Sequence, residues 1–483
     1  MNLLLIILFL TAFSFISNFF CKYYKIFVFL SVLIVISFYF SLSKNFFHTG
    51  IFYPTHDIYA YKPCGNYYNL LIDSLKEGKL YIAKINNLKN INPFDTSVYK
   101  DNVYIYFGLT PLLVFYIPFH LITGLYLTDK MLVFVLSGIF FLISLLILKI
   151  FLKETNLKIQ PFIKILSIFL IGFCNYLPFL VIRGAIYEIC ILSAMICLFL
   201  SVITIYRLNT NKKHKYLFVF LLGSLLSFSV GARPQYILFI PIFYLAILYI
   251  ECNKNNKITD FIVLTFLFFT PCIAYGIIIA TYNYLRFDSF IEFGWKYQLN
   301  EYNQTHYFRD IKNILISIKY NFFEFPETGT KTVFSLVKSK GHSGGKELAA
   351  GIIYSFPLIL NFVIILPFIK YTAKNKNIFI CILLFLSIAL INFITTGLIG
   401  GIIVRYVFEY LSIIVILSLF IFYYLLNKQK NHKTLFVLFN ILFVIFFIFS
   451  VYINISFLFC EPNSEFFNLP VSGSYKTVIK FLF

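Results

Sequence analysis

Residues 377–400, NIFICILLFLSIALINFITTGLIG, carry no Asp, Glu, Lys, Arg or His side chain. A helix that crosses a bilayer needs roughly 20 apolar residues, so this stretch predicts a membrane-spanning helix. Hydrophobic residues make up 60% of the chain and charged residues 12%, far from the balance of a soluble domain. We predict an all-α polytopic membrane protein, a single domain over 1–483 with about 12 transmembrane helices. The other predicted spans are 2–20, 25–43, 131–152, 160–181, 186–206, 216–232, 236–250, 261–283, 347–369, 404–426 and 434–454.

The lysines indicate which loops face the cytoplasm. Cytoplasmic loops of membrane proteins are enriched in Lys and Arg, and the short loops between alternate spans hold most of the lysines. The enrichment of lysine in cytoplasmic loops therefore accounts for the formal charge of +20. We expect no nucleic-acid partner. The loops concerned contain Lys22 and Lys25; Lys149, Lys153, Lys158 and Lys164; Lys212, Lys213 and Lys215; Lys254 and Lys257; Lys370, Lys374 and Lys376; and Lys428, Lys430 and Lys433.

This topology places three large segments outside: a first external loop at 44–130, a second at 284–346 and a C-terminal tail at 455–483. Within the first loop, residues 67–82 suit a short amphipathic juxtamembrane helix. Residues 104–126 are apolar enough to span, but crossing would reverse every later lysine-rich loop. Their prolines and glycines also oppose a regular helix. We expect a juxtamembrane or re-entrant element there.

Ionisable residues gather at the external ends of the predicted spans, where they are costly and often functional. Five of the six arginines lie on this side, and a guanidinium can hold phosphate through two parallel hydrogen bonds. Arg309 lies inside the second loop. We predict that the other four bind a phosphate-bearing lipid substrate: Arg183, Arg233, Arg286 and Arg405.

Carboxylates lie on the same side. Asp57, Asp95 and Glu188 are the candidate catalytic acids, and Glu409 follows Arg405 by about one helical turn. A carboxylate can take a proton from an acceptor hydroxyl while cations stabilise a departing phosphate, which is the chemistry of glycosyl transfer from a lipid phosphate.

The layout resembles the GT-C superfamily of polyprenyl-phosphate-sugar-dependent glycosyltransferases, and within it protein-mannosyltransferase-like enzymes and bacterial members. The resemblance rests on the large first external loop, on Asp57 where those enzymes have a catalytic aspartate, and on 106–112, YFGLTPL, which is similar to their proline-containing element. It implies an inverting transferase with Asp57 as base and Tyr106 in the substrate site. It also implies a polyprenyl-phosphate-linked sugar donor, a glycan, lipid or protein acceptor, and a site on the periplasmic face of a bacterial inner membrane.

The chain departs from the family pattern at two points. His56 precedes Asp57 where relatives have an adjacent acidic pair, and one proline stands where they have two. These departures leave Asp95 as a rival base. The histidines form no HxH or HxxxH pattern, so we expect no structural metal site, and a transient divalent ion beside Asp57 stays open.

Structural explanations compete with these roles. Asp57 and Asp95 could cap local turns, Glu188 could form an ion pair with Arg183, and Arg233 or Arg405 could reach lipid headgroups. Two other functions are also compatible with the topology: a transporter or flippase for a lipid-linked oligosaccharide, and a polymerase or ligase of surface polysaccharide. A transporter of this kind often shows an internal repeat, and we find none in the sequence.

Overall fold

The computed structural model describes residues 22–44, 52–53, 67–85, 96–252, 258–299, 311–326, 337–338, 348–349, 351–398 and 404–458. In this part of the chain, ten helices or helix pairs are long and apolar enough to cross a membrane. They are α2 (Tyr24–Lys44), α6 (Asp129–Thr155), α7 (Pro161–Phe173) with α8 (Leu177–Arg183), α9 (Ile186–Thr210), α10 (Lys215–Ala232), η6 (Pro234–Leu238) with α11 (Phe239–Cys252), α12 (Ile258–Phe287), α16 (Lys376–Leu398), α17 (Val404–Lys428) and α18 (Lys433–Leu458).

These helices confirm a polytopic α-helical membrane protein and ten of the predicted spans. The predicted span 2–20 lies outside the described residues. The prediction of one long helix over 347–369 is wrong, because the chain there forms β8 (Leu348–Ala349), α14 (Ile352–Ser355), η10 (Pro357–Ile364) and α15 (Ile365–Thr372). Phe356 takes an extended conformation, and Pro357 then starts a new turn without a backbone N–H to donate.

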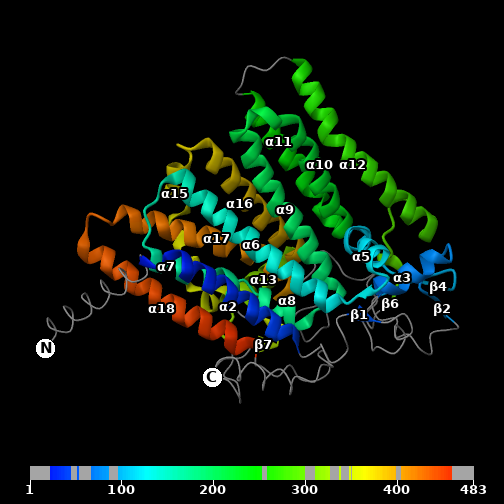
Figure 1. Ribbon diagram of the computed structural model, residues 1–483, viewed down its shortest axis with the longest axis horizontal. Coiled ribbons are helices and arrows are strands. Elements are labelled where there is room, and N and C mark those ends of the chain that lie inside the picture. The colour runs from blue at the N-terminus through cyan, green and yellow to red at the C-terminus, as the bar shows by residue number, and fades with distance from the viewer. Residues whose placement is uncertain are drawn as a thin grey trace.

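The helices form one bundle in which α9 and α17 are buried along most of their length, while α12 and α18 lie at the edge (Figure 1). Aromatic rings fill the middle of the bundle. Phe140 of α6 packs against Phe199 of α9 and Phe408 of α17, with ring centroids 4.7 and 5.1 Å apart. Such pairs stabilise a core beyond the apolar area that they bury.

The described residues of 67–85 and 96–104, in the segment predicted to be the first external loop, fold against one end of this bundle, near the end of α12 (Figure 1). Helix α3 (Tyr67–Lys76) lies inside the predicted amphipathic stretch 67–82. Residues 104–126 contain one short continuous helix, made of α4 (Leu109–Pro111), η4 (Leu112–Tyr116) and α5 (Ile117–Thr123). At this length the helix is shorter than a spanning helix requires, in agreement with a juxtamembrane or re-entrant element.

A small antiparallel sheet, not predicted from the sequence, joins the two segments that were predicted to form the large external loops. Its order is β2 (Ala83–Lys84), β4 (Asn102–Tyr104), β3 (Thr96–Tyr99) and β6 (Gln298–Leu299). The pairing of β3 with β6 brings the segment after α12 onto the first loop. The remaining described elements are β1 (Phe52–Tyr53), which pairs with β5 (Tyr126–Leu127), β7 (Val337–Lys338), which pairs with β8, η5 (Lys212–His214), η7 (Trp295–Tyr297), α13 (Ile311–Ile318) and η9 (Lys319–Phe323).

Polar contacts, exposed at Asp288 and buried at Ser97, reinforce this junction. Asp288, just after α12, accepts hydrogen bonds from Tyr99 at 2.9 Å and from Lys100 at 2.5 Å. The hydrogen bond from the Lys100 ammonium, followed by that from Tyr99, lowers the pKa of the Asp288 carboxyl below its usual value. Ser97 also donates to the carbonyl of Gly294 at 2.7 Å.

Glycine permits the close packing of the first loop against the bundle. A Cβ at Gly108 would lie 2.3 Å from the carbonyl oxygen of Gly231 and 2.4 Å from that of Ala232. Next to this contact, the Thr110 hydroxyl donates to the carbonyl of Phe228 at 2.8 Å. The start of the α4–η4–α5 helix is therefore held directly on the end of α10.

Candidate functional site

Three arginines from separate elements meet around two tyrosine rings. They lie at the end of the bundle where α8 and α10 end and α9 and α17 begin. Arg183 lies 4.9 Å from the ring centre of Tyr187, and Arg405 lies 4.6 Å from the same ring. Arg405 also lies 5.2 Å from the ring centre of Tyr406, which Arg233 approaches to 5.3 Å. We call these five residues the arginine–tyrosine cluster. Stacking on a ring face is favourable for a guanidinium and keeps its planar edge in a defined orientation.

Each ring is supplied by the start of a buried helix. Tyr187 is the second residue of α9 and Tyr406 the third of α17, while Arg183 ends α8 and Arg233 follows α10. Helix starts and ends therefore position the whole cluster, which explains why its members are far apart in sequence.

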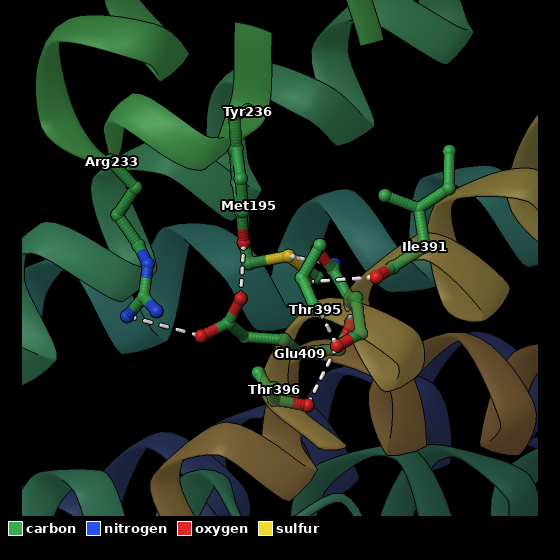
Figure 2. Close-up of polar contacts among 8 residues, drawn as sticks. Met195, Arg233, Tyr236, Ile391, Thr395, Thr396 and Glu409 are labelled. Carbon is green, nitrogen blue, oxygen red and sulfur yellow. Dashed lines mark hydrogen bonds and ion pairs between the residues drawn. The ribbon is translucent and has the colours of Figure 1, made fainter. Parts of the chain in front are cut away.

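Glu409 anchors one side of the cluster from inside the bundle. Its carboxylate is fully buried and lies 3.1 Å from Nη1 of Arg233. The Tyr236 hydroxyl donates to the other carboxylate oxygen at 2.7 Å, as Figure 2 shows. Although burial lowers the pKa of Arg233, the Glu409 carboxylate outweighs that effect and raises it, so this guanidinium stays charged.

Asn392 of α16 adds a contact behind this ion pair. Its amide donates to the backbone carbonyl of Glu409 at 3.4 Å and also approaches the sulfur of Met195. Arg233 and Tyr236 thus hold the carboxylate of Glu409, while Asn392 of α16 contacts its backbone, and the carboxylate acts as a structural anchor for Arg233.

Glu188 holds the other side. It is fully buried, one oxygen lies 3.4 Å from Nη1 of Arg183, and the other accepts the backbone N–H of Ala185 at 3.1 Å. A carboxylate in the first turn also interacts favourably with the helix dipole. The ion pair with Arg183 that the sequence suggested is present, and a catalytic role for Glu188 stays a prediction.

Arg286 lies in the last turn of α12, and its contacts are with residues outside the arginine–tyrosine cluster. Its guanidinium donates to the carbonyl of Ile105 at 2.5 Å and to Oδ1 of Asn283 at 2.8 Å. It also stacks on Tyr282 at 3.8 Å from the ring centre. Arg286 is 3% exposed and holds the backbone of Ile105 from the end of α12.

Aromatic residues connect that segment to the arginine–tyrosine cluster. Tyr106 packs on Phe107 at 4.4 Å between ring centroids, and Phe107 contacts Tyr187 edge to face at 5.0 Å. Tyr67, the first residue of α3, stacks on Phe107 at 6.4 Å. Two successive ring contacts therefore connect Tyr106 to Tyr187, the ring on which Arg183 and Arg405 stack. The candidate bases Asp57 and Asp95 lie outside the described residues.

Two charged residues at the start of α6, Asp129 and Lys130, were not predicted from the sequence to lie near the site. Asp129 is 5% exposed and accepts a hydrogen bond from Tyr116. The stem of Lys130 packs so closely on Gly184, next to Arg183, that a Cβ at Gly184 would lie 2.7 Å from it. The only signal was Thr128 before Asp129, which indicates a helix cap, and Thr128 does accept the N–H of Met131.

The arginine–tyrosine cluster contributes three guanidiniums, and Glu188 and Glu409 contribute two carboxylates. The sum is one positive charge in excess. Within the described ranges, no three His, Cys, Asp or Glu side chains are placed to share a metal ion. In comparisons with known proteins, no family model, no curated protein and no solved structure matches this chain.

Proposed function

We propose that this chain is an inverting membrane glycosyltransferase that moves a sugar from a polyprenyl-phosphate donor to a cell-envelope acceptor. In this proposal it works at the external face of a bacterial inner membrane. The observation that carries the proposal is the arginine–tyrosine cluster, in which three guanidiniums from distant helices meet at one end of a membrane-spanning bundle.

The charge of the cluster supports a phosphodiester as the donor. A sugar linked to a lipid by one phosphate carries a single negative charge, and the five charged groups named above have one positive charge in excess. Arginine binds phosphate through its planar fork, and its weak hydration makes it better suited than lysine to a partly buried site.

In the proposed reaction, Asp57 takes the proton of an acceptor hydroxyl, with Asp95 as the rival base. The acceptor oxygen forms a bond to the anomeric carbon while the bond from that carbon to the phosphate oxygen breaks. The electron pair leaves with the lipid phosphate, which gains a second negative charge. Arg183, Arg233 and Arg405 stabilise that charge as it develops.

Lipid-phosphate binding gives the first test. The purified full-length protein in nanodiscs is titrated with undecaprenyl phosphate and followed by native mass spectrometry. We expect Arg405→Gln to weaken binding about tenfold or more, since a hydrogen bond to a charged group is worth about 1.5–3 kcal/mol. Arg207→Gln is the matched control, because Arg207 is an exposed arginine at the opposite end of α9. Undecaprenol, which lacks the phosphate, should bind the wild-type protein and the Arg405→Gln variant equally.

Sugar transfer gives the second test. Membranes containing Asp57→Asn or Asp95→Asn are supplied with radiolabelled undecaprenyl-phosphate hexoses, and transfer to endogenous envelope acceptors is measured. We expect transfer to be lost in one of the two variants while lipid binding stays intact. Full transfer by both would refute an aspartate base in the first loop. Movement of the lipid across the membrane without any transfer would instead identify a transporter or flippase, and transfer of whole oligosaccharides a polymerase or ligase.

A further inference from the structure

Helix α12 presents an exposed apolar face along most of its length. With α18, it is the least buried of the ten spanning helices and pairs named above, and it lies at the edge of the bundle (Figure 1). Exposed apolar side chains recur on it at helical spacing, as at Ile273, Ile277 and Tyr284. No charged residue lies between Asp260 and Arg286. An uncharged, exposed face of this kind is the lipid-contacting surface of a spanning helix.

This apolar face continues beyond the end of the helix. Five large apolar or aromatic side chains in the last turns of α12 and in the segment after it are between 47% and 86% exposed. We call them the apolar tip: Tyr284, Leu285, Phe290, Ile291 and Trp295. The rings of Tyr284 and Phe290 stack with centroids 4.7 Å apart and an interplanar angle of 14°. The chain after α12 therefore turns back against the exposed face of the helix.

Hydrogen bonds hold the backbone of the apolar tip in place. The amide of Asn283 donates to the carbonyl of Phe290 at 3.4 Å. Further along, Oε1 of Glu292 accepts the backbone N–H of Gly294 at 2.7 Å, and the carbonyl of Gly294 accepts a hydrogen bond from Ser97. The tip is thus a fixed turn that presents its apolar side chains outward. Exposed apolar patches mark a surface that contacts a partner or a membrane.

The length of α12 gives the level of the tip. Asp260 lies 3.7 Å from Lys215, the first residue of α10, so this ion pair marks the other end of both helices. Tyr284 is 24 residues beyond Asp260, which is roughly 36 Å along the helix. A bilayer has a hydrocarbon core of about 30 Å and a full thickness of about 40–45 Å with its headgroups. When the ion pair lies at one membrane interface, the tip lies at the other.

We propose that the apolar tip inserts into the lipid leaflet at the end of the bundle that carries the arginine–tyrosine cluster, at the interface between hydrocarbon and headgroups. Its composition suits that depth, because Trp and Tyr are enriched at membrane–water interfaces. Lipid fits the tip better than a soluble protein does, since Phe290 packs on Tyr284 and so extends the lipid-contacting face of α12. A tip anchored in lipid is compatible with any function of the bundle.

An anchored tip also fixes the depth of the arginine–tyrosine cluster. A Cβ at Gly231 would lie 2.3 Å from the ring of Tyr275, so the last turn of α10 is level with Tyr275. Tyr284 is nine residues further along α12, or roughly 13 Å. Arg233 comes two residues after Gly231 and is therefore roughly 10 Å closer than the tip to the middle of the bundle. The cluster then lies within the thickness of the bilayer and not above its surface.

The only tryptophan of the chain, Trp295, belongs to the tip, so its fluorescence reports where the tip lies. The full-length wild-type protein is placed in nanodiscs whose phospholipids carry bromine either near the carbonyl end or near the methyl end of the acyl chains. Bromine quenches tryptophan only at short range. We expect bromine near the carbonyl end to remove about half or more of the Trp295 emission and bromine near the methyl end to remove less, because tryptophan prefers the interface.

Tryptophans at two other positions, each in a Trp295→Phe background, calibrate the measurement. Ile273→Trp lies on the exposed face of α12 about 20 Å from Asp260, so bromine near the methyl end should quench it most. Asn431→Trp lies in the exposed turn between α17 and α18, beside Lys430 and Lys433. Iodide in the water should quench this tryptophan, and lipid bromine should quench it little.

Two results would overturn the proposal. One is quenching of Trp295 by lipid bromine that is no stronger than the quenching of Asn431→Trp, which would show that the tip faces water. The other is quenching of Trp295 that is strongest with bromine near the methyl end, as at Ile273→Trp, which would place the tip in the hydrocarbon core. These measurements need no lipid-linked donor, so failure of the proposed function is read separately, from undecaprenyl phosphate binding by Arg405→Gln.

Discussion

Replacing Glu409 with glutamine should destabilise the protein much more than the same change at Glu188. Glu409 is fully buried and lies 3.1 Å from Arg233, whose side chain is 14% exposed. Removal of one partner from such a buried pair leaves an uncompensated charge and typically costs about 3–5 kcal/mol. Glutamine can still accept the Tyr236 hydrogen bond, so we expect about 3 kcal/mol. The Arg183–Glu188 pair is longer, at 3.4 Å, and Arg183 is 30% exposed, so we expect about 1 kcal/mol there.

Thermal inactivation in detergent, followed by size-exclusion chromatography, measures this difference. The only tryptophan, Trp295, is 48% exposed and would report mainly its own loop, so fluorescence is a poor probe. Unfolding of large membrane proteins is often irreversible, so the variants must be compared at one heating time. The double variant Arg233→Met with Glu409→Leu should recover most of the loss, because an apolar pair can replace a buried ion pair at little cost. Equal losses for Glu409→Gln and Glu188→Gln would refute this reasoning.

Four other outcomes follow from the packing. Gly108→Ala should abolish stable folding, because its Cβ would meet two backbone carbonyls, whereas Gly138→Ala, with nothing within 4 Å, should be neutral in a chromatographic yield assay. Arg286→Gln should accelerate proteolysis of the first external loop, since it loses charged hydrogen bonds worth about 1.5–3 kcal/mol each. Asp288→Asn should lower the thermal midpoint slightly at pH 7, and this difference should disappear as the pH falls through the lowered folded-state pKa of Asp288, because a lowered folded-state pKa contributes stability above the unfolded value and loses it as the pH falls through the folded value. In a variant that retains Cys252 as its only cysteine, a membrane-permeant maleimide should label this exposed thiol in intact cells and an impermeant one should not, if the lysine-rich end is cytoplasmic.

The spanning helices could be predicted because hydropathy is a local property of the chain. Runs such as 377–400 need no knowledge of their neighbours, and α16 forms there. The prediction of one helix over 347–369 was wrong because it used only the summed hydropathy of the run. It did not take account of Pro357, where one helical segment follows another. The sheet was missed because β2 and β6 have two residues each, too few for an alternating pattern.

For the candidate site, sidedness predicted which residues come together but not what each one contacts. Four arginines were predicted to bind one substrate at one end; Arg286 instead contacts Ile105 and Asn283, whereas Arg183, Arg233 and Arg405 meet at that end. Their stacking on Tyr187 and Tyr406 depends on the rotation of α9 and α17, which no local pattern encodes. The pairing of Glu409 with Arg233 also joins helices that are far apart in the sequence.

The pairing of β3 with β6 has a consequence for how the protein is made. Ser97 and Gly294, which hydrogen-bond beside this pairing, are 197 residues apart. At a synthesis rate of about 5–20 residues per second, the ribosome needs about 10–40 s to travel between them. During that interval the nascent first loop has emerged without its partner strand, and α12 must be inserted before the strand can arrive. Translation speed therefore sets a minimum time for which β3 remains without its partner strand.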